Sequence, residues 1–336
     1  MRHRTLGTTG PAVAELGLGT MGMSDLYGPA DETESVATIH AAMDAGINLL
    51  DTGDFYGEGH NELLIREALR TRDRDDAVIS VKFGVRKDPT GAFQHAPFDT
   101  TPAGVKDRLA YTLRRLGTDH VDIYRPARLN PDVPIEDTVG AIAEMVQAGY
   151  VRHIGLSEVG ADTLRRAAAV HPIADLQIEY SLVSRGIEAA ILPTARELGV
   201  GITAYGVLSR GLLSGHWNPE RELTAGDFRG ISPRFQGENL TANLRLVEAL
   251  REVAESLDAT VAQVAIAWVA SRGTDIVPLV GARRRDRLTE SLEATQIALS
   301  PADLAAIEAA VPQEEVAGER YASFLMASLD SEPAAS

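Results

Sequence analysis

The chain has 336 residues, 44% of them hydrophobic, which is enough to bury a large core in one α/β domain or two average ones. It carries 32 Lys and Arg against 48 Asp and Glu, a net charge of −16, and this acidic balance disfavours nucleic acid as a partner. Cysteine is absent, which excludes disulfides, thiolate catalysis and cysteine-ligated zinc or iron–sulfur clusters.

The first residues, MRHRTLGTTGPAV, lack the apolar core of a signal peptide. No apolar run has the length of a membrane span. We therefore expect a cytoplasmic protein without a membrane partner.

Short β-rich segments alternate with amphipathic segments along nearly the whole chain. Between the β-rich segments, apolar residues recur at spacings of three and four, as in ETESVATIHAAMDAG and PIEDTVGAIAEMVQAG, which predicts helices. Glycines just past several helical segments mark their predicted ends: Gly46, Gly117, Gly149 and Gly199. The predicted strands cover residues 13–20, 48–53, 77–84, 121–127, 151–158, 176–181, 201–207 and 276–281.

Eight strands, each followed by a helix, predict an α/β fold of the (β/α)8 TIM barrel type, as one domain over residues 1–330. A doubly wound sheet is the weaker interpretation, because LGLGTMG after the first strand lacks the spacing of a dinucleotide-binding fingerprint. We expect an N-terminal β-hairpin around LGTTGPAV and a long loop, roughly 208–241, after the seventh strand. The last residues, 331–336, are expected to form a disordered tail.

The stretch DTGDFYGEGHNE, residues 51–62, is rich in groups that bind metals or exchange protons. A calcium loop is excluded, because glycine and phenylalanine stand where its third and fifth positions need oxygen ligands. A transition-metal site on His60 has little support, since no second histidine stands nearby, and we expect no metal. Asp54, Glu58 and His60 are interpreted as loop-surface residues, which leaves the stretch as the rim of an enzyme pocket.

Three polar residues fall near the carboxyl ends of the predicted strands, where such barrels place their pocket. Asp51 ends the second strand, Tyr56 follows in the loop above it, and Lys82 lies near the end of the third strand. A charge inside AVISVKFG is costly unless it is paired, and Asp51 is the natural partner of Lys82. The lysine cation is expected to lower the pKa of Tyr56, which makes the phenol a proton donor or acceptor. The same residues also fit a purely structural ion pair.

The segment GINLLDTGDFYGEGHNELLIREAL resembles the signature of the aldo-keto reductase superfamily. The likeness continues through RTLGTTGPAVAELGLGTMGM, VPIEDTVGAIAEMVQAGYVRHIGLSE, ITAYGVLSRGLLSG, VGARRRDRLTESL and GERY, an ordered series over almost the entire chain. It implies the barrel fold and the reduction of an aldehyde or ketone by NADPH. By position, it implies that Tyr56 is the general acid, assisted by Lys82 and Asp51.

The resemblance also implies that a nicotinamide dinucleotide is held extended across the top of the barrel. Ser157 and Gln177 match positions that bind the nicotinamide amide, for which they supply a donor and an acceptor. Tyr205 matches the aromatic residue that stacks on the nicotinamide ring. Other matched cofactor positions lie in the pyrophosphate loop and after the eighth strand: Leu208, Ser209, Gly211, Gly281, Arg283, Arg287, Glu290 and Ser291.

The run GARRRDRL gathers four arginines where a helix begins after the eighth strand. Helix N-termini attract anions and arginine suits phosphate, so we interpret Arg283 and Arg287 as ligands of the adenosine 2′-phosphate, with Glu290 near the adenine. NADPH/NADP+ is then the expected cofactor, and NADH is disfavoured. The alternative is a solvated basic helix face. Ser291 stands where family members have asparagine, which weakens one adenine contact.

The chain departs from the family pattern in DIYRPARLNP, where Ala127 takes the position of the usual catalytic histidine. Losing a donor to the carbonyl oxygen costs on the order of 10²-fold in rate. Arg125 and Arg128 are the candidate replacements, and alanine also leaves room for a bulky ring. The sequence around Ala127 and Glu158 resembles a subgroup that includes pyridoxal reductases, which suggests pyridoxal or a similar aromatic aldehyde as substrate.

The sequence therefore predicts an NADPH-dependent reductase of a small-molecule aldehyde or ketone. Two alternatives stay open: an NADP-dependent alcohol or sugar dehydrogenase, and a nicotinamide-binding regulatory subunit with little turnover, which Ala127 slightly favours. Substrate choice is expected to depend on the loops around Phe55, 85–98 and 208–241 and on the C-terminal segment. A homo-oligomer is compatible with the sequence.

Overall fold

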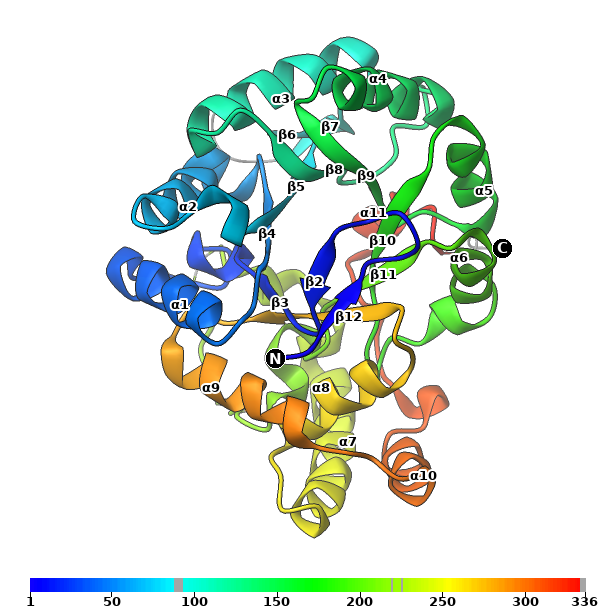
Figure 1. The fold of residues 1–336 in the computed structure, drawn as a ribbon. Coiled ribbons are helices and arrows are strands. Elements are labelled where there is room, and N and C mark those ends of the chain that lie inside the picture. Colours follow the sequence, from blue (N-terminus) through cyan, green and yellow to red (C-terminus); the bar gives the residue numbers. More distant parts are fainter. Residues whose placement is uncertain (88–92, 219, 225, 333–336) are drawn as a thin grey trace.

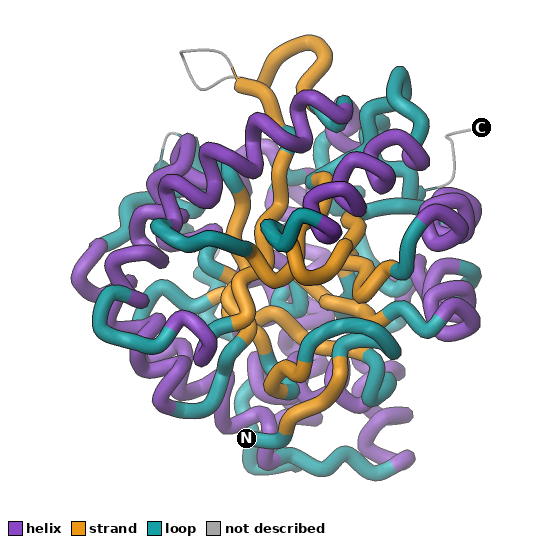
Figure 2. Tube along the Cα trace, turned by 45° about the horizontal axis from the view of Figure 1, so that its top comes forward, coloured by secondary structure: helices purple, strands orange, loops and turns teal. Residues whose placement is uncertain are grey.

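The computed structural model describes residues 1–87, 93–218, 220–224 and 226–332. Eight parallel strands close into a barrel that helices surround, which confirms the predicted (β/α)8 fold (Figures 1 and 2). The barrel strands are β3 (Gly17–Gly19), β4 (Leu49–Gly53), β5 (Val78–Phe83), β8 (Val121–Pro126), β9 (Val151–Ser157), β10 (Ile173–Glu179), β11 (Gly201–Tyr205) and β12 (Ile276–Gly281).

A helix follows each barrel strand along the chain, and α7, α10 and α11 are additions to this repeat. The predicted helix ends are confirmed: Gly46, Gly117, Gly149 and Gly199 all have positive φ angles, which glycine adopts without the steric cost of a side chain. The helices are α1 (Glu32–Asp44), α2 (His60–Leu69), α3 (Pro102–Leu116), α4 (Ile135–Gln147), α5 (Ala161–Val170), α6 (Ile191–Leu198), α7 (Gly237–Ser256), α8 (Val261–Ser271), α9 (Arg285–Glu293), α10 (Pro301–Ala310) and α11 (Ser323–Met326).

A short hairpin, β1 (His3–Thr5) and β2 (Ala12–Ala14), lies across one end of the barrel (Figure 1). Its Leu6 and Val13 pack with inward-facing residues of the barrel, including Leu49 and Val277. The hairpin was predicted, but the single strand expected over residues 13–20 is wrong. The chain there divides into β2, which pairs with β1, and β3, which joins the barrel.

The opposite rim of the barrel carries most of the additions. The loop after β11 holds three short 3-10 turns (Ser209–Ser214, Phe228–Ile231 and Pro233–Phe235) and leads into α7, as a long loop in this place was predicted. A second hairpin, β6 (Val85–Lys87) and β7 (Phe93–Phe98), follows β5 and was not predicted.

The C-terminal segment returns to this rim. Of the predicted tail, Ser331 and Glu332 form hydrogen bonds with Glu158 and Arg320, and residues 333–336 lie outside the described part of the chain. No single helix of the described residues is long and apolar enough to cross a membrane; α7 and α8 reach that length and composition only as a pair bent by 84°.

Candidate active site

The pocket is built from inward-facing residues at the carboxyl ends of the barrel strands. Residues two apart on a strand face the same side, so Ser80 and Lys82 of β5 both point into the barrel. Lys82 Nζ donates to Asp51 Oδ2 on the adjacent β4 at 2.5 Å. Only 4% of Asp51 and 5% of Lys82 is exposed, so the expected ion pair is present and is shielded from solvent.

Further hydrogen bonds hold the Asp51–Lys82 pair in one geometry. Asp51 Oδ1 accepts from Ser80 Oγ at 2.9 Å and from Gln177 Nε2 at 2.7 Å. Lys82 Nζ also donates to the Thr52 carbonyl at 3.0 Å. Both carboxylate oxygens of Asp51 thus accept hydrogen bonds, which offsets the cost of burying its charge.

Tyr56 begins a short turn, Tyr56–Gly59, which Asp54 and Phe55 separate from the end of β4. The chain reverses there because Gly57 and Gly59 have φ angles of 55° and 100°. The centroid of the Tyr56 ring lies 5.0 Å from Lys82 Nζ. No residue of the described ranges forms a hydrogen bond with the Tyr56 hydroxyl, so this group is available to a ligand.

The expected effect of Lys82 on Tyr56 is wrong. Burial penalises the phenolate and raises the pKa of Tyr56 well above its ordinary value, and the nearby Asp51 carboxylate raises it further. Burial also lowers the pKa of Lys82, while Asp51 opposes that change. In the site without a ligand, the lysine cation does not offset burial and the Asp51 charge. Tyr56 therefore keeps its proton throughout the neutral pH range.

The two candidate replacements for the missing histidine lie in different places. Arg125 is fully buried inside the barrel, where its guanidinium forms an ion pair with Asp175 at 2.9 Å and donates to Ser80 Oγ at 2.8 Å. It therefore supports the layer below the pocket and does not replace the histidine. Arg128 lies at the rim, where it donates to the Tyr321 hydroxyl at 3.4 Å.

Three residues matched to the nicotinamide site lie together at the ends of β9, β10 and β11. The Ser157 hydroxyl is buried without a hydrogen-bond partner among the described residues. Gln177 donates its amide hydrogen to Asp51, which leaves its carbonyl oxygen as an acceptor. The Tyr205 hydroxyl bonds with Glu158 at 2.7 Å and with Tyr321 at 2.8 Å, so the ring is held in one orientation.

The loop after β11 has an uncommon backbone. Ser209 and Arg210 have φ angles of 44° and 56°, although neither is glycine, and Gly211 follows at 99°. Such residues are rare outside functional loops, because the side chain crowds the backbone. The Ser209 hydroxyl is buried and lacks a partner within the described residues. Leu208 precedes this bend and packs partly buried against the core.

Two glycines leave room at paired strand ends. Gly281 at the end of β12 lies in register with Gly19 of β3. A Cβ on Gly281 would meet no atom within 4 Å, and one on Gly19 only the Val280 carbonyl at 3.7 Å. Packing of the protein does not demand glycine at these positions, which suits the close approach of a ligand.

The arginine run is mostly engaged within the protein. Arg283 donates to the backbone carbonyls of residues 27–29, and Arg287 pairs with Glu290 at 3.0 Å. The other two arginines of the run pair with Asp286 and Glu34. Glu290 also contacts His216 at 3.1 Å. The Ser291 hydroxyl donates to the Arg287 carbonyl of its own helix.

A buried charge cluster connects the rim loops, and the sequence interpretation missed it. Glu158 pairs with Arg320 at 2.5 Å, and Glu179 lies within 3.2–3.5 Å of Arg210, Arg234 and Arg320. These residues, together called the rim charge cluster, come from β9, β10, the loop after β11 and the C-terminal segment. Arginine lowers the pKa of both carboxyl groups against the effect of burial. The sequence did contain a signal for this cluster, since the acidic residues Glu158 and Glu179 stand at the ends of buried strands.

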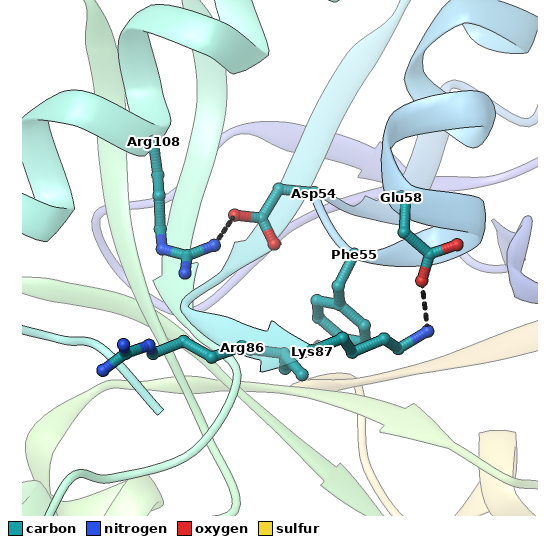
Figure 3. Close-up of a pocket in the computed structure, with 7 residues that line it drawn as sticks. Asp54, Phe55, Glu58, Arg86, Lys87 and Arg108 are labelled. Carbon is teal, nitrogen blue, oxygen red and sulfur yellow. Dashed lines mark hydrogen bonds and ion pairs between the residues drawn. The ribbon is translucent and has the colours of Figure 1, made fainter. Parts of the chain in front are cut away.

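A small polar pocket of about 320 Å³ lies beside the Tyr56 turn (Figure 3). Asp54 is 7% exposed and pairs with Arg108 at 3.0 Å, so the prediction of a surface position is wrong for this residue. Asp54 follows the end of β4, and its carboxylate points toward Arg108 of α3 (Figure 3). Glu58 is exposed, as expected, and pairs with Lys87.

These features fit a nicotinamide dinucleotide. Buried hydroxyls without partners among the described residues (Ser157 and Ser209), an oriented aromatic ring (Tyr205) and open glycine positions (Gly19 and Gly281) all lie at or shortly after the carboxyl ends of barrel strands. Within the described ranges, no three His, Cys, Asp or Glu side chains are grouped so as to hold a metal ion.

The sequence model of the aldo/keto reductase family matches residues 15–312. The chain belongs to this family. It is 40% identical over 317 residues to a probable aldo-keto reductase 1 of Glycine max, and the match covers 94% of this chain and 90% of the relative. Aldo-keto reductases are oxidoreductases that act on carbonyl and alcohol groups with nicotinamide cofactors, and this protein is an enzyme of that class.

Solved structures support the same family. A glycerol dehydrogenase from Gluconobacter oxydans superposes with a TM-score of 0.81 at 28% identity, covering 93% of this chain and 96% of that one. An aldo-keto reductase from Bacillus halodurans in its holo form gives a TM-score of 0.76 at 27% identity, with coverage of 93% and 97%. A thermostable aldo-keto reductase bound to the inhibitor epalrestat gives 0.72 at 29% identity, with coverage of 92% and 100%.

Proposed function

We propose that this aldo-keto reductase reduces a small-molecule aldehyde or ketone to an alcohol with NADPH, and that Tyr56 is the general acid. The observation that carries the proposal is the state of Tyr56. Its hydroxyl has no partner within the described residues, its pKa is raised, and its ring lies 5.0 Å from a lysine that is fixed by Asp51. A phenol that stays protonated at neutral pH suits a proton donor.

Each residue of the trio has a distinct task in this proposal. The bound dihydronicotinamide supplies a hydride. Tyr56 donates its proton to the substrate oxygen as that oxygen becomes negative. Lys82 stabilises the phenolate that Tyr56 becomes, and Asp51 keeps Lys82 charged and aimed at the ring.

The proposed cofactor contacts follow the features along the rim. Ser157 and Gln177 bind the carboxamide, Tyr205 stacks on the ring, and Ser209 with Gly211 lies at the pyrophosphate. Arg287 is our choice for the 2′-phosphate, because 45% of its side chain is exposed although it pairs with Glu290 at 3.0 Å and lies 3.9 Å from Asp286. Arg283 contributes to the 2′-phosphate site only indirectly, because its guanidinium already donates to three backbone carbonyls and holds residues 27–29 in place.

The opposite direction is the second candidate. A structural relative is a glycerol dehydrogenase, which favours testing alcohols as well as carbonyls. We also propose a cytoplasmic location, in keeping with the expectation from the sequence.

The test is NADPH consumption, followed by the absorbance of the reduced nicotinamide, against pyridoxal, nitrobenzaldehyde, methylglyoxal and ring ketones. Tyr56→Phe is expected to lower kcat by about 10²–10⁴-fold, because it removes the acid and little else. Tyr111→Phe is the matched control, since Tyr111 is 66% exposed on α3. Tight NADPH binding without turnover of any carbonyl would overturn the proposal and favour a dehydrogenase or a regulatory role.

A further inference from the structure

Arg128 differs from the arginines of the rim charge cluster, which have carboxylate partners. Arg210, Arg234 and Arg320 each have a carboxylate within 3.5 Å. Arg128 has none among the described residues: it donates to the Ala127 carbonyl at 2.6 Å and to the Tyr321 hydroxyl at 3.4 Å. The chain has an excess of acidic residues, so an unpaired cation at this place is notable.

The position of Arg128 directs its charge toward the reacting groups. It follows Ala127 just after β8, at the end of the barrel where the Tyr56 turn lies. Its positive charge reaches two members of the trio, for it works to lower the pKa of both Tyr56 and Lys82. A guanidinium carries five N–H donors, so the two bonds in the structure leave donors for a ligand.

The C-terminal segment holds this guanidinium in place. The carbon of the Arg128 guanidinium lies 5.8 Å from the centroid of the Tyr321 ring. The Tyr321 hydroxyl bonds in turn with Tyr205, which matches the position beneath the nicotinamide ring. Arg128 is therefore connected through Tyr321 to Tyr205.

Because Arg128 lies at the rim and no carboxylate of the described residues forms an ion pair with it, we propose that Arg128 is a catalytic residue that donates a hydrogen bond to the substrate carbonyl oxygen. The proposal rests on the proposed reductase function. As the hydride bonds to the carbonyl carbon, the C–O π pair moves onto the oxygen, which then takes the proton of Tyr56. Arg128 neither gains nor loses a proton. It stabilises the negative charge while that charge exists, and solvent returns a proton to Tyr56.

Other cations at the rim do not fit this task. Arg125 is paired with Asp175 in the barrel interior, and Lys82 is paired with Asp51. The guanidinium groups of the rim charge cluster are compensated by Glu158 and Glu179. An unpaired cation stabilises a developing oxyanion best, because no carboxylate competes for its donors.

The kinetic test compares Arg128→Met, Arg128→Lys and the matched control Arg166→Met, an exposed arginine of α5 paired with Glu136. With neutral aldehydes, Arg128→Met is expected to lower kcat by about 10²-fold, while NADPH affinity and thermal stability stay near wild type. Arg128→Lys should recover part of the loss, and added guanidinium should rescue Arg128→Met but not Tyr56→Phe.

A binding test complements the kinetics. Benzoate places a negative oxygen where the reacting oxygen would lie, and its affinity for the NADP+ complex is measured by calorimetry. Arg128→Met is expected to weaken benzoate binding by about tenfold or more, because a charge-assisted hydrogen bond is lost. Arg166→Met should leave it unchanged.

The outcomes separate this proposal from the proposed function. If Tyr56→Phe abolishes turnover while Arg128→Met keeps the wild-type kcat and benzoate affinity, the role of Arg128 is overturned and the reductase function stands. A loss that appears only in NADPH affinity, or only with carboxylated substrates, also overturns it. If the wild type reduces no carbonyl, both proposals fail.

Discussion

Residue by residue, the chemistry of the pocket depends on burial as much as on neighbouring charge. Lys82 was expected to acidify Tyr56, yet its cation is neutralised by Asp51 and the phenol is desolvated, so the pKa of Tyr56 rises. An acid catalyst benefits from this arrangement, because the proton stays on the oxygen until the substrate becomes basic enough to take it.

The Asp51–Lys82 pair is expected to contribute strongly to stability only while both charges are present. Lys82→Met leaves Asp51 buried with no cation, and we expect a loss of about 3–5 kcal/mol in the free energy of unfolding. The double variant Asp51→Asn/Lys82→Met should lose less than Lys82→Met alone, because no unpaired charge remains. Denaturant unfolding checks this, and equal losses in the two variants would contradict it.

Asp54 is expected to make stability depend on pH. Burial raises the pKa of its carboxyl to about 6, despite Arg108. Folding therefore favours the protonated form of Asp54. Its contribution to the free energy of unfolding is complete below the pKa of the unfolded state, about 3.9, and is lost as the pH rises through the pKa of the folded state.

Asp54→Asn removes this titration. We expect the variant to be more stable than wild type at pH 8 by about 1–3 kcal/mol, with the difference shrinking toward pH 4. Thermal unfolding across this range is the measurement. A difference that does not change with pH would refute the assignment to Asp54.

Among the elements, the rim charge cluster joins segments that the barrel repeat does not itself position. Arg320 reaches Glu158 at the end of β9 and Glu179 at the end of β10. Arg210 and Arg234 attach the loop after β11 to the same Glu179. The loop and the C-terminal segment are therefore expected to stay in place or to loosen together.

Arg320→Met is expected to release the C-terminal segment. It leaves Glu158 without its cation, which should lower the free energy of unfolding by about 3–5 kcal/mol and expose residues 316–332 to limited proteolysis. NADPH affinity should fall as well, because Tyr205 is bonded to Glu158 and Tyr321. Arg284→Met is the matched control, since its pair with Asp286 is exposed and contributes at most about 1 kcal/mol. Unchanged proteolysis in Arg320→Met would show that the pair does not anchor the segment.

At the scale of the whole molecule, bound cofactor is expected to stabilise the folded state by contacting both sides of the rim. A ligand present at 100 times its Kd stabilises the folded state by about 2.7 kcal/mol. NADP+ should therefore raise the Tm more than NAD+ at equal concentration, and added salt should reduce the advantage by screening the 2′-phosphate. Arg287→Met should remove most of this difference in Tm between NADP+ and NAD+. Equal shifts with the two cofactors in wild type would contradict the preference for NADPH.

The sequence by itself determined the barrel, because the signals are local. Strand and helix periods, with glycine at the helix ends, repeat along the chain and need no knowledge of distant contacts. It also indicated the Asp51–Lys82 pair, since both residues lie at the ends of neighbouring strands and a buried lysine requires a partner. Family resemblance predicted the residues that would bind the cofactor.

Only the tertiary structure decided which charges remain free. Arg125 and Arg128 are three residues apart in the sequence. Arg125 forms an ion pair with Asp175 inside the barrel, whereas Arg128 lies at the rim and pairs with no carboxylate among the described residues. The partner of Glu158 is Arg320, far along the chain. Electrostatics depends on distance and burial in space, and strand alternation alone specifies neither the depth of a side chain nor the partner that reaches it.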